Sequence, residues 1–587
     1  MLDLKIAGGT VVDGTGQPRF QADIGVKDGR IIAIGAVSEE ACETIDATGR
    51  IVSPGFVDIH THYDAQVFWD PTLSPSCFHG VTTILGGFCG FSIAPITPEA
   101  SDYLMRMLAR VEGMPLETLQ IGVPWTWRSF GEFLASFEGR VGLNAGFFAG
   151  HSAIRRVVMG ERAVGEKATP EEIVAMKALL GQSLAEGALG FSSTISASHN
   201  DGDGNPVPSR WADYSEIIAL GSVVKDHEGT GLELLPEIDF APEVVELLAE
   251  LSLAGNRPVN WNALGITDRP DARSLAAHQL AVSDYARARG AEVLALTVPV
   301  TPDMFCNLKT GVLFDSNPGV WREIFRWPIE QRIEALRDPA FRDRMRADLA
   351  RVPAESFAKY KARIDKFTVI SVTADKNKQY EGRFAGDIAR EEGRDPLDVM
   401  LDIAIADDLT TVFTPYLGGN DAETFKLRAE VWHDDRTIIG ASDAGAHLDM
   451  VDTFSFSTDV LSMGVRKFGI MTLEEAVYQL TDRPARYMGL IDRGQLKQGY
   501  FADIIIFDEA TVGRGPTYFR EDVPGNQARA YADATGIDHV FVNGVEIVRK
   551  GEHTGKLPGK VLRSGKDTRT VPLDALRENR RFELMPA

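Results

Sequence analysis

Residues 55–445 alternate between short apolar segments and longer segments whose apolar residues have helical spacing. Helix-like stretches such as 169–188 and 240–255 lie between several of the short segments. Eight strands that alternate with helices are typical of a closed parallel barrel. The predicted fold is therefore an α/β fold, a (β/α)8 TIM-type barrel. Its candidate strands are GFVDIHTH, GVTTILGGFCG, GLNAGFFAGH, GALGFSST, GLELLPEID, RPVNWNAL, AEVLALTV and RTIIGASDAG.

The two ends of the chain have a different pattern. Residues 2–52 and 499–555 contain alternating apolar and polar residues, broken at the N-terminal end by D-G and G-G pairs that favour hairpins. Each end alone is too short to bury a core. We therefore predict one small β-sandwich domain built from residues 1–54 and 486–560, around a barrel over 55–485. The polar tail, 561–587, is expected to pack over the surface.

Residues 300–400 interrupt the alternation. The stretch 321–352 reads as charged helices, which predicts a helical insertion near the mouth of the barrel. FTVISVTA (367–374) and TTVFTPYLGG (410–419) are two further strand candidates. The identity of the seventh barrel strand is open at this point.

Charge and composition restrict the partners. A net charge of −23 would repel nucleic acids and anionic membranes. The first residues lack a signal peptide, and no apolar run approaches the roughly 18 residues that span a membrane. Four irregularly spaced cysteines suit a reducing compartment. We expect a cytoplasmic protein with no nucleic-acid or membrane partner, and homo-oligomerisation is left open.

The sequence GFVDIHTHYD (55–64) places two histidines one residue apart at the end of an apolar segment. On a strand, His60 and His62 would point to the same face, and two converging imidazoles suit Zn²⁺. Asp58 and Asp64 are expected to orient the rings as hydrogen-bond acceptors.

Two later residues are candidate partners of this pair. Cys89 ends the second candidate strand, where the residues alone favour a buried thiol and a metal ligand equally. Asp443 closes the last strand, where a carboxylate can bind a metal and accept a proton from metal-bound water, or simply cap the next helix. His447, four residues later, would orient substrate or be solvated.

These residues carry a resemblance to the amidohydrolase superfamily of metal-dependent hydrolases. The run GFVDIHTHYDAQVFWDPTLSPSCFHGVTTILGGFCGFSIAP, GHSAIRRVVMG (150–160) and FVNGVEIV with GEHTGKLPGKVLR resemble the N-acyl-D-amino-acid deacylase (D-aminoacylase) group. The resemblance implies that His60, His62 and Cys89 are metal ligands. It implies that Asp443 is both a ligand and the general base.

The same resemblance places His151 and Arg155 near the substrate. In the expected mechanism, the metal and His151 would stabilise the oxyanion. Two features of the group are missing. It has a histidine at the end of strand five and another in an SHLK-like stretch ending strand six, but GLELLPEID and RPVNWNALGI contain neither. Glu237 is the good metal ligand near the end of strand five, whereas Asn260 and Asn262 are weak replacements. The lysine of the SHLK stretch is also absent.

The missing histidines leave two expectations: a zinc ion held weakly by Cys89, or a single ion held mainly by His60, His62 and Asp443. The expected cofactor is Zn²⁺, as one or two divalent ions. The expected activity is hydrolysis of N-acyl (D-)amino acids or related small amides by metal-bound hydroxide. Alternatives are hydrolysis of a cyclic amide, carbamate or lactone, and a non-catalytic binding barrel. Residues 195–211, with His199, Asp201 and Arg210, would form a loop at the mouth, solvated or in contact with substrate.

Overall fold

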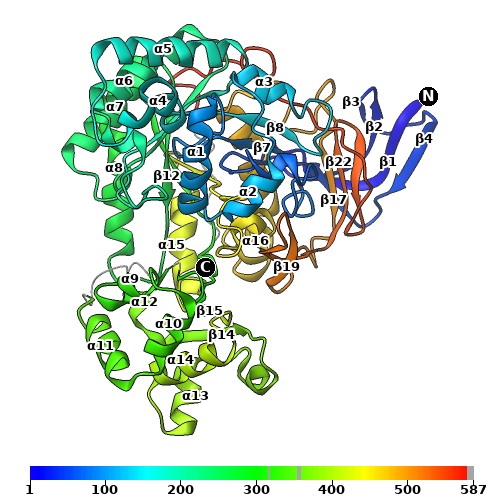
Figure 1. Cartoon of the computed structure of the whole chain (residues 1–587). Coiled ribbons are helices and arrows are strands. Elements are labelled where there is room, and N and C mark those ends of the chain that lie inside the picture. The colour runs from blue at the N-terminus through cyan, green and yellow to red at the C-terminus, as the bar shows by residue number, and fades with distance from the viewer. Residues whose placement is uncertain (312, 315–316, 353–358, 578–587) are drawn as a thin grey trace. The chain divides into compact units, whose positions relative to one another are not determined.

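The computed structural model describes residues 1–311, 313–314, 317–352 and 359–577. The chain forms two compact units. Unit 1 comprises Met1–Val300, Gly419–Leu448 and Thr453–Ala587, and unit 2 comprises Thr301–Gly418 and Asp449–Asp452. Figure 1 shows unit 2, in green to yellow-green, as mostly helical.

One nine-stranded sheet of unit 1 joins strands from both ends of the chain (Figure 1). β5 pairs antiparallel with β17, so that Val52 lies opposite Ile506. Apolar residues from both ends, including Leu4, Ile24 and Phe541, form one buried cluster. The strands, in sheet order, are β24 (Glu552–His553), β23 (Val545–Arg549), β22 (Ile537–Val542), β17 (Ile504–Phe507), β5 (Ile51–Pro54), β1 (Leu2–Val11), β2 (Phe20–Lys27) and β3 (Arg30–Gly35), with β4 (Ala41–Asp46) also on β1.

Two parallel sheets form the centre of unit 1. One has the order β6-β7-β8, over Phe56–Asp58, Val81–Gly86 and Asn144–Phe147. The other has the order β16-β13-β12-β11-β10-β9, over Thr437–Ile439, Val293–Thr297, Val259–Leu264, Gly231–Leu235, Gly190–Thr194 and Ala149–Gly150. Only Phe148 separates β8 from β9. An isolated parallel bridge links Thr61 and Ala444, just beyond β6 and β16.

Each of the eight candidate segments contains a strand of these two sheets, and the predicted α/β class is confirmed. Their side chains are almost all buried, as expected of parallel strands with helices on their faces. AEVLALTV contains β13, which pairs with β12 and β16. AEVLALTV, and not either of the two further candidates, therefore lies between RPVNWNAL and RTIIGASDAG in the sheet.

The connections in unit 1 are mostly helical. Local sequence explains where they begin: Thr169 and Glu172 form a capping box at α5, with Pro170 as its first residue. The helices are α1 (Pro98–Val111), α2 (Leu116–Gly122), α3 (Phe130–Ala135), α4 (His151–Met159), α5 (Pro170–Ala185), α6 (Tyr214–Gly221), α7 (Pro242–Gly255), α8 (Ala272–Ala288), α15 (Ala422–Trp432), α16 (Phe456–Asp459), α17 (Leu473–Leu480) and α18 (Asp482–Tyr487), with a π-helix at Val460–Lys467.

Smaller elements complete unit 1. β18 (Gly513–Arg514) pairs with β21 (Ala534–Thr535), and β19 (Tyr518–Val523) pairs with β20 (Gln527–Tyr531). In the polar tail, Leu562 is fully buried and its amide donates to the Ala145 carbonyl. Residues 578–587 of that predicted tail lie outside the described residues.

Unit 2 has its own core, which includes Phe314, Trp321, Phe367 and Met400. The stretch predicted as charged helices contains α10 (Ile329–Arg337), α11 (Pro339–Leu349) and all but the first residue of α9 (Val320–Ile324). They are followed by α12 (Lys359–Ala362), α13 (Ala385–Glu392) and α14 (Pro396–Ala406). The two extra strand candidates contain β14 (Phe367–Ser371) and β15 (Val412–Pro415), which pair antiparallel with each other.

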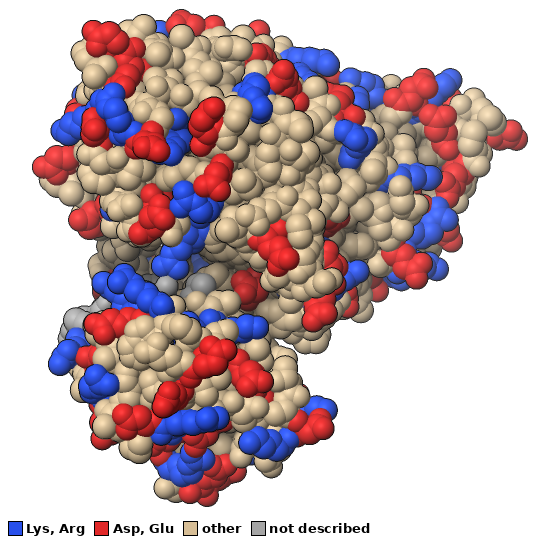
Figure 2. Space-filling model, in the orientation of Figure 1, with Lys and Arg blue, Asp and Glu red and all other residues tan. Residues whose placement is uncertain are grey.

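The surface of unit 2 carries charges of both signs, interspersed as Figure 2 shows. Arg342 and Arg346 form ion pairs with Asp398, and Arg342 also pairs with Asp402.

In the described parts of the chain, no helix is both long and apolar enough to cross a membrane.

Candidate metal centre

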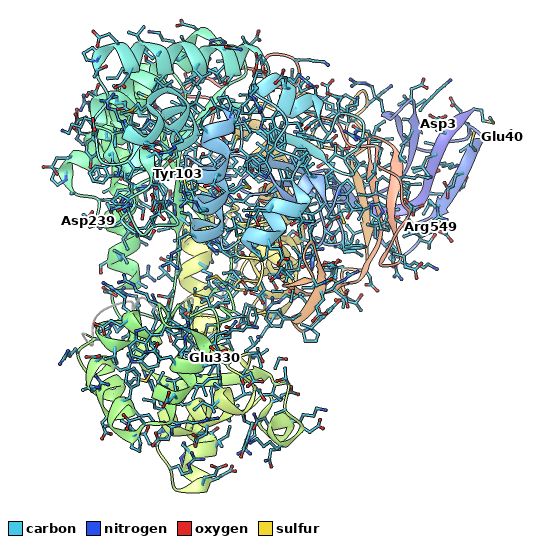
Figure 3. The ribbon with its side chains drawn as sticks, in the orientation of Figure 1. Asp3, Glu40, Tyr103, Asp239, Glu330 and Arg549 are labelled. Atoms are coloured by element: carbon cyan, nitrogen blue, oxygen red, sulfur yellow. The ribbon has the colours of Figure 1, made fainter. Side chains whose placement is uncertain are left out.

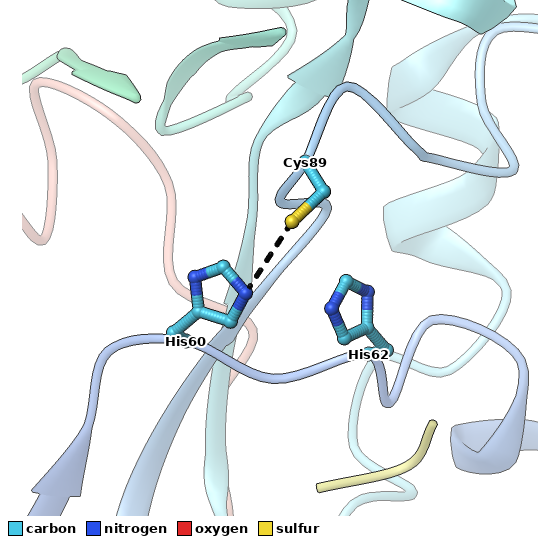
Figure 4. Close-up of side chains that lie close together, drawn as sticks. All are labelled: His60, His62 and Cys89. Atoms are coloured by element: carbon cyan, nitrogen blue, oxygen red, sulfur yellow. Dashed lines mark hydrogen bonds between the residues drawn. The ribbon is translucent and has the colours of Figure 1, made fainter. Parts of the chain in front are cut away.

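His60 and His62 follow β6 directly and lie on one side of the backbone (Figure 4). The amide of Thr61 donates to Leu85, and the amide of His62 donates to Ala444, so neighbouring strand ends fix this segment. The side chains of His60 and His62 are only 1% and 5% exposed. Their rings lie edge to face, with centroids 5.3 Å apart. The two imidazoles are therefore held rigidly at the carboxyl end of β6.

Cys89 brings a thiol to the same place. It follows β7 in a left-handed conformation with φ of 57°, and its Sγ lies 3.7 Å from His60 Nε2 (Figure 4). One ligand atom each from His60, His62 and Cys89 lie within 4.8 Å of one another. Among the residues that the structure describes, this is the one group of three or more histidine, cysteine or acidic residues that meets this distance.

Asp443, just after β16, supplies a carboxylate to the group. Its Oδ1 lies 3.2 Å from His60 Nε2 and 3.7 Å from His62 Nε2. Burial opposes ionisation of Asp443, but hydrogen bonds from His60 and His62 outweigh it and hold its pKa well below the usual range. Its side chain remains 42% exposed, so it is the accessible member of the group.

The four donors fit a divalent metal ion. Tetrahedral zinc with bonds of roughly 2.0–2.3 Å needs donor atoms about 3.3–3.8 Å apart. The three separations around His60 Nε2 and His62 Nε2, at 3.7, 3.2 and 3.7 Å, are close to that range. His60, His62, Cys89 and Asp443 together offer two imidazoles, a thiol and a carboxylate, a donor set that suits a borderline metal.

The acidic residues around the histidines differ from the prediction. Asp58 accepts from the His60 amide and the Ser442 hydroxyl, and Asp64 accepts from the Gly87 amide. They accept from backbone amides and from a serine hydroxyl, not from the imidazole N–H groups. Glu112, at the end of α1, lies beside the ring instead, with Oε1 3.5 Å from His62 Nδ1.

Glu112 was missed because nothing in the sequence places the end of α1 at this site. Burial raises its pKa to about 7, partly offset by the charge of His62. Burial lowers the pKa of His62, but the charges of Glu112 and Asp443 outweigh that effect and raise it to about 9.

The acidic residue of strand five beside Cys89 is Glu233, not Glu237. The Cys89 amide donates to Glu233 Oε2 at 3.0 Å. Glu237 lies after β11, is partly exposed, and accepts from the Ala197 amide. Glu237 is therefore corrected to a loop contact. It was chosen because it follows the strand, whereas Glu233 lies within the strand and is fully buried.

His151 and Arg155 form a separate buried cluster. His151 Nδ1 lies 2.9 Å from the Ser193 hydroxyl, and His151 Nε2 lies 2.9 Å from Glu216. Arg155 donates to both oxygens of Glu216 and to the Glu166 carbonyl. Both side chains are completely buried, and both ring nitrogens of His151 are engaged. The structure thus gives the two predicted substrate contacts a role in packing α4 against α6.

Two other histidines have an open ring nitrogen. Within the described part of the chain, the buried Nδ1 atoms of His447 and His199 have no hydrogen-bond partner. Burial lowers the pKa of both, and the charges of Asp443 and His62 act on both. Because the same two charges act on both histidines, His199 lies in the same region as His447. These nitrogens are free to bind the polar atoms of a ligand.

The loop that carries His199 is held in place and is not simply solvated. The Tyr103 hydroxyl of α1 (labelled in Figure 3) donates to Asp201 at 3.0 Å. The ring of His199 packs against Phe91, with centroids 4.9 Å apart. The Arg210 guanidinium donates to the His199 carbonyl.

The chain is similar to a family of known proteins. A family model described as "Amidohydrolase family" matches residues 43–548. D-aminoacylase of Alcaligenes xylosoxydans xylosoxydans is 28% identical, over 95% of this chain and 97% of its own length.

Two solved structures are also similar. A D-aminoacylase with a binuclear metal centre has 25% identity and a TM-score of 0.63, covering 96% of this chain and 100% of its own. The N-acyl-D-glutamate deacylase of Bordetella bronchiseptica, complexed with zinc and a phosphonate inhibitor, has 26% identity and a TM-score of 0.60 at the same coverage.

Proposed function

Because the chain belongs to the amidohydrolase family, we propose that it is a metal-dependent hydrolase of the amide bond in N-acyl-D-amino acids or related small amides. The predicted resemblance is confirmed by the family match and by nearly full-length similarity to D-aminoacylase. One observation carries the proposal: His60, His62, Cys89 and Asp443 converge from three separate strand ends.

We propose that the parallel strands close into the (β/α)8 barrel. Treating β8 and β9 as one strand gives the circular order β6-β7-β8/β9-β10-β11-β12-β13-β16, and the Thr61–Ala444 bridge supports closure between the last and the first. The proposed barrel covers 55–485 and is interrupted by unit 2. Residues 1–54 and 486–560 form the accompanying β domain. The site then lies at the carboxyl ends of the strands, as in other barrels of this type.

The proposed metal ligands are His60, His62, Cys89 and Asp443, and the proposed ion is Zn²⁺. When bound, such an ion polarises a carbonyl and lowers the pKa of water toward about 7. Asp443 is the accessible carboxylate beside the histidines, so it is placed to accept the proton of the attacking water and pass it to the leaving nitrogen.

Substrate recognition is proposed for His447 and His199. Their unpartnered Nδ1 atoms lie in the electrostatic range of Asp443 and can bind the amide or carboxylate of a substrate. Leaving a buried polar atom unpaired costs about 1–3 kcal/mol, so binding a ligand there offsets an existing penalty.

All four cysteines are free, which supports the proposed cytoplasmic location.

Hydrolysis of a panel of N-acyl-D- and N-acyl-L-amino acids tests the proposal. Release of the free amino acid from D substrates at least about tenfold faster than from L substrates, equivalent to ~1.4 kcal/mol in the barrier, is the expected result. Activity confined to cyclic amides, carbamates or lactones would contradict the proposed substrate class. No hydrolysis of any member by zinc-loaded protein would contradict the proposed activity.

A further inference from the structure

Cys89 is enclosed on one side by a hydrogen-bonded pair, Glu233 on β11 and Asn262 on β12. Asn262 Nδ2 donates to Glu233 Oε1 at 2.5 Å and contacts Cys89 Sγ at 3.8 Å. The other oxygen of Glu233 accepts from the Cys89 amide. All three residues are buried, with exposures of 0% for Glu233, 3% for Asn262 and 7% for Cys89. Both Glu233 oxygens are therefore already in use beside the sulfur.

The orientation of the Asn262 amide is fixed by a chain of hydrogen bonds. The Tyr487 hydroxyl donates to Asn260 Oδ1, and Asn260 Nδ2 donates to Asn262 Oδ1. The Asn262 oxygen thus faces Asn260, and its N–H groups face Glu233 and Cys89. A hydrogen-bond donor, not a lone pair, is directed at the sulfur from this side.

From these contacts we infer that the centre takes one metal ion per chain, and that the Glu233–Asn262 pair occupies the side of Cys89 where a second ion would have to bind. This inference rests on the proposed function. A second ion beside the sulfur would face the N–H groups of Asn262 and would have to share Glu233 oxygens that already accept hydrogen bonds from Asn262 and from the Cys89 amide. The first ion needs none of these atoms, because His60, His62, Cys89 and Asp443 already offer it four donors.

The pair has a second consequence for the single ion, because it positions Cys89. The amide contact with Glu233 holds the left-handed backbone of Cys89, and the Asn262 contact holds its side chain. Partners that orient a ligand in this way typically contribute about 10–100-fold to metal affinity. Glu233 and Asn262 are thus positioning residues for Cys89.

Cobalt titration of metal-free protein tests the number of ions. Co²⁺ reports a bound thiolate through a near-ultraviolet charge-transfer band, and elemental analysis gives the number of ions. We expect one Co²⁺ per chain with this band, and loss of the band in Cys89→Ser. Cys77→Ser is the matched control, because Cys77 is equally buried and lies outside the group, and it should keep the band. Two tightly bound ions per chain, or a band indifferent to Cys89→Ser, would overturn the inference.

Two further variants test the pair itself. Asn262→Ala should keep one ion per chain but weaken Co²⁺ affinity by about 10–100-fold and shift the band. Unchanged affinity and band would refute the positioning role. Replacing both residues, Glu233→His with Asn262→His, directs imidazole lone pairs at the sulfur side and should raise the capacity to two ions. If that double variant does not fold, the number of ions bound by the wild type and the Co²⁺ affinity of Asn262→Ala still test the inference.

Amide hydrolysis measured on the same preparations separates this inference from the proposed function. One ion per chain without hydrolysis of any N-acyl amino acid would contradict the function and leave the inference standing. Two ions per chain with hydrolysis would contradict the inference and leave the proposed function standing.

Discussion

At the scale of single residues, Asp443 is the proposed metal ligand that combines two properties. It contacts both histidines, and its side chain remains accessible. We expect Asp443→Asn to lower kcat on the preferred amide by about 10²–10⁴-fold, since the amide cannot accept the proton of the attacking water.

Asp239→Asn is the control for this prediction. Asp239 is exposed after β11 (labelled in Figure 3) and should leave kcat unchanged. Equal rates for Asp443→Asn and the wild type would remove Asp443 from the reaction.

The residues that sequence reasoning identified share one property: they end a strand. His60 and His62 follow an apolar segment at a spacing of two, and Cys89 and Asp443 end two other segments, so a barrel brings their side chains together. Glu112 has no such signal, because its place depends on where α1 ends. Asn262 was considered only as a weak metal ligand, and its contacts with Glu233 and Cys89 depend on how three strands come together.

At the scale of elements, the pair of α4 and α6 depends on a buried charge. Arg155 and His151 on α4 both bind Glu216 on α6. Glu216→Gln would leave Arg155 buried without its counter-charge, so we expect a loss of about 3–5 kcal/mol in the free energy of unfolding. The matched variant Glu474→Gln removes a partly exposed pair with Arg19 and should cost about 1 kcal/mol or less. Chemical unfolding of both variants checks this, and equal losses would contradict it.

The same cluster makes stability depend on pH. Burial lowers the pKa of His151 below its usual 6.5, so below pH 6.5 the unfolded chain binds a proton that the folded chain does not. Burial opposes ionisation of Glu216, but its bonds to His151 and Arg155 outweigh this and lower its pKa, so its contribution is also lost on acidification. We expect the contribution of His151 to stability to fall as pH decreases from 6.5, by at most about 1.4 kcal/mol per pH unit for one proton.

Unfolding curves from pH 7.5 to 5 measure this slope in the wild type and His151→Gln. The variant should lose part of the slope, whereas His278→Gln, at an exposed position on α8, should retain it. A slope unaffected by His151→Gln would show that other groups cause it.

The elements themselves were predictable where the pattern was local. Each of the eight apolar segments contains a parallel strand, because buried strands need continuous apolar residues. The pairing of β14 with β15 was not predictable, since their apolar pattern resembles that of a barrel strand. The sheet that joins β5 and β17 depends on a contact between residues more than 450 positions apart, and only the shortness of each end pointed to it.

At the scale of the whole molecule, the donor set predicts which ion stabilises the fold. Imidazole and thiolate ligands favour Zn²⁺ over Mg²⁺, which prefers oxygen ligands. Zn²⁺ at a hundred times its dissociation constant should stabilise metal-free protein by about 2.7 kcal/mol, seen as a higher melting temperature. Mg²⁺ at the same concentration should produce no shift, and a His60→Ala, His62→Ala double variant should not respond to Zn²⁺. An equal shift with Mg²⁺ would contradict the proposed ligands.

The central claim is that this chain hydrolyses an amide through a metal ion held by its strand ends. Hydrolysis of an N-acyl-D-amino acid by metal-free protein, measured before and after one equivalent of Zn²⁺ per chain is added, tests it most directly. The account predicts negligible hydrolysis without metal, and restored hydrolysis in the wild type but not in Asp443→Asn. Equal hydrolysis with and without the ion, or none after it is added, would contradict the account.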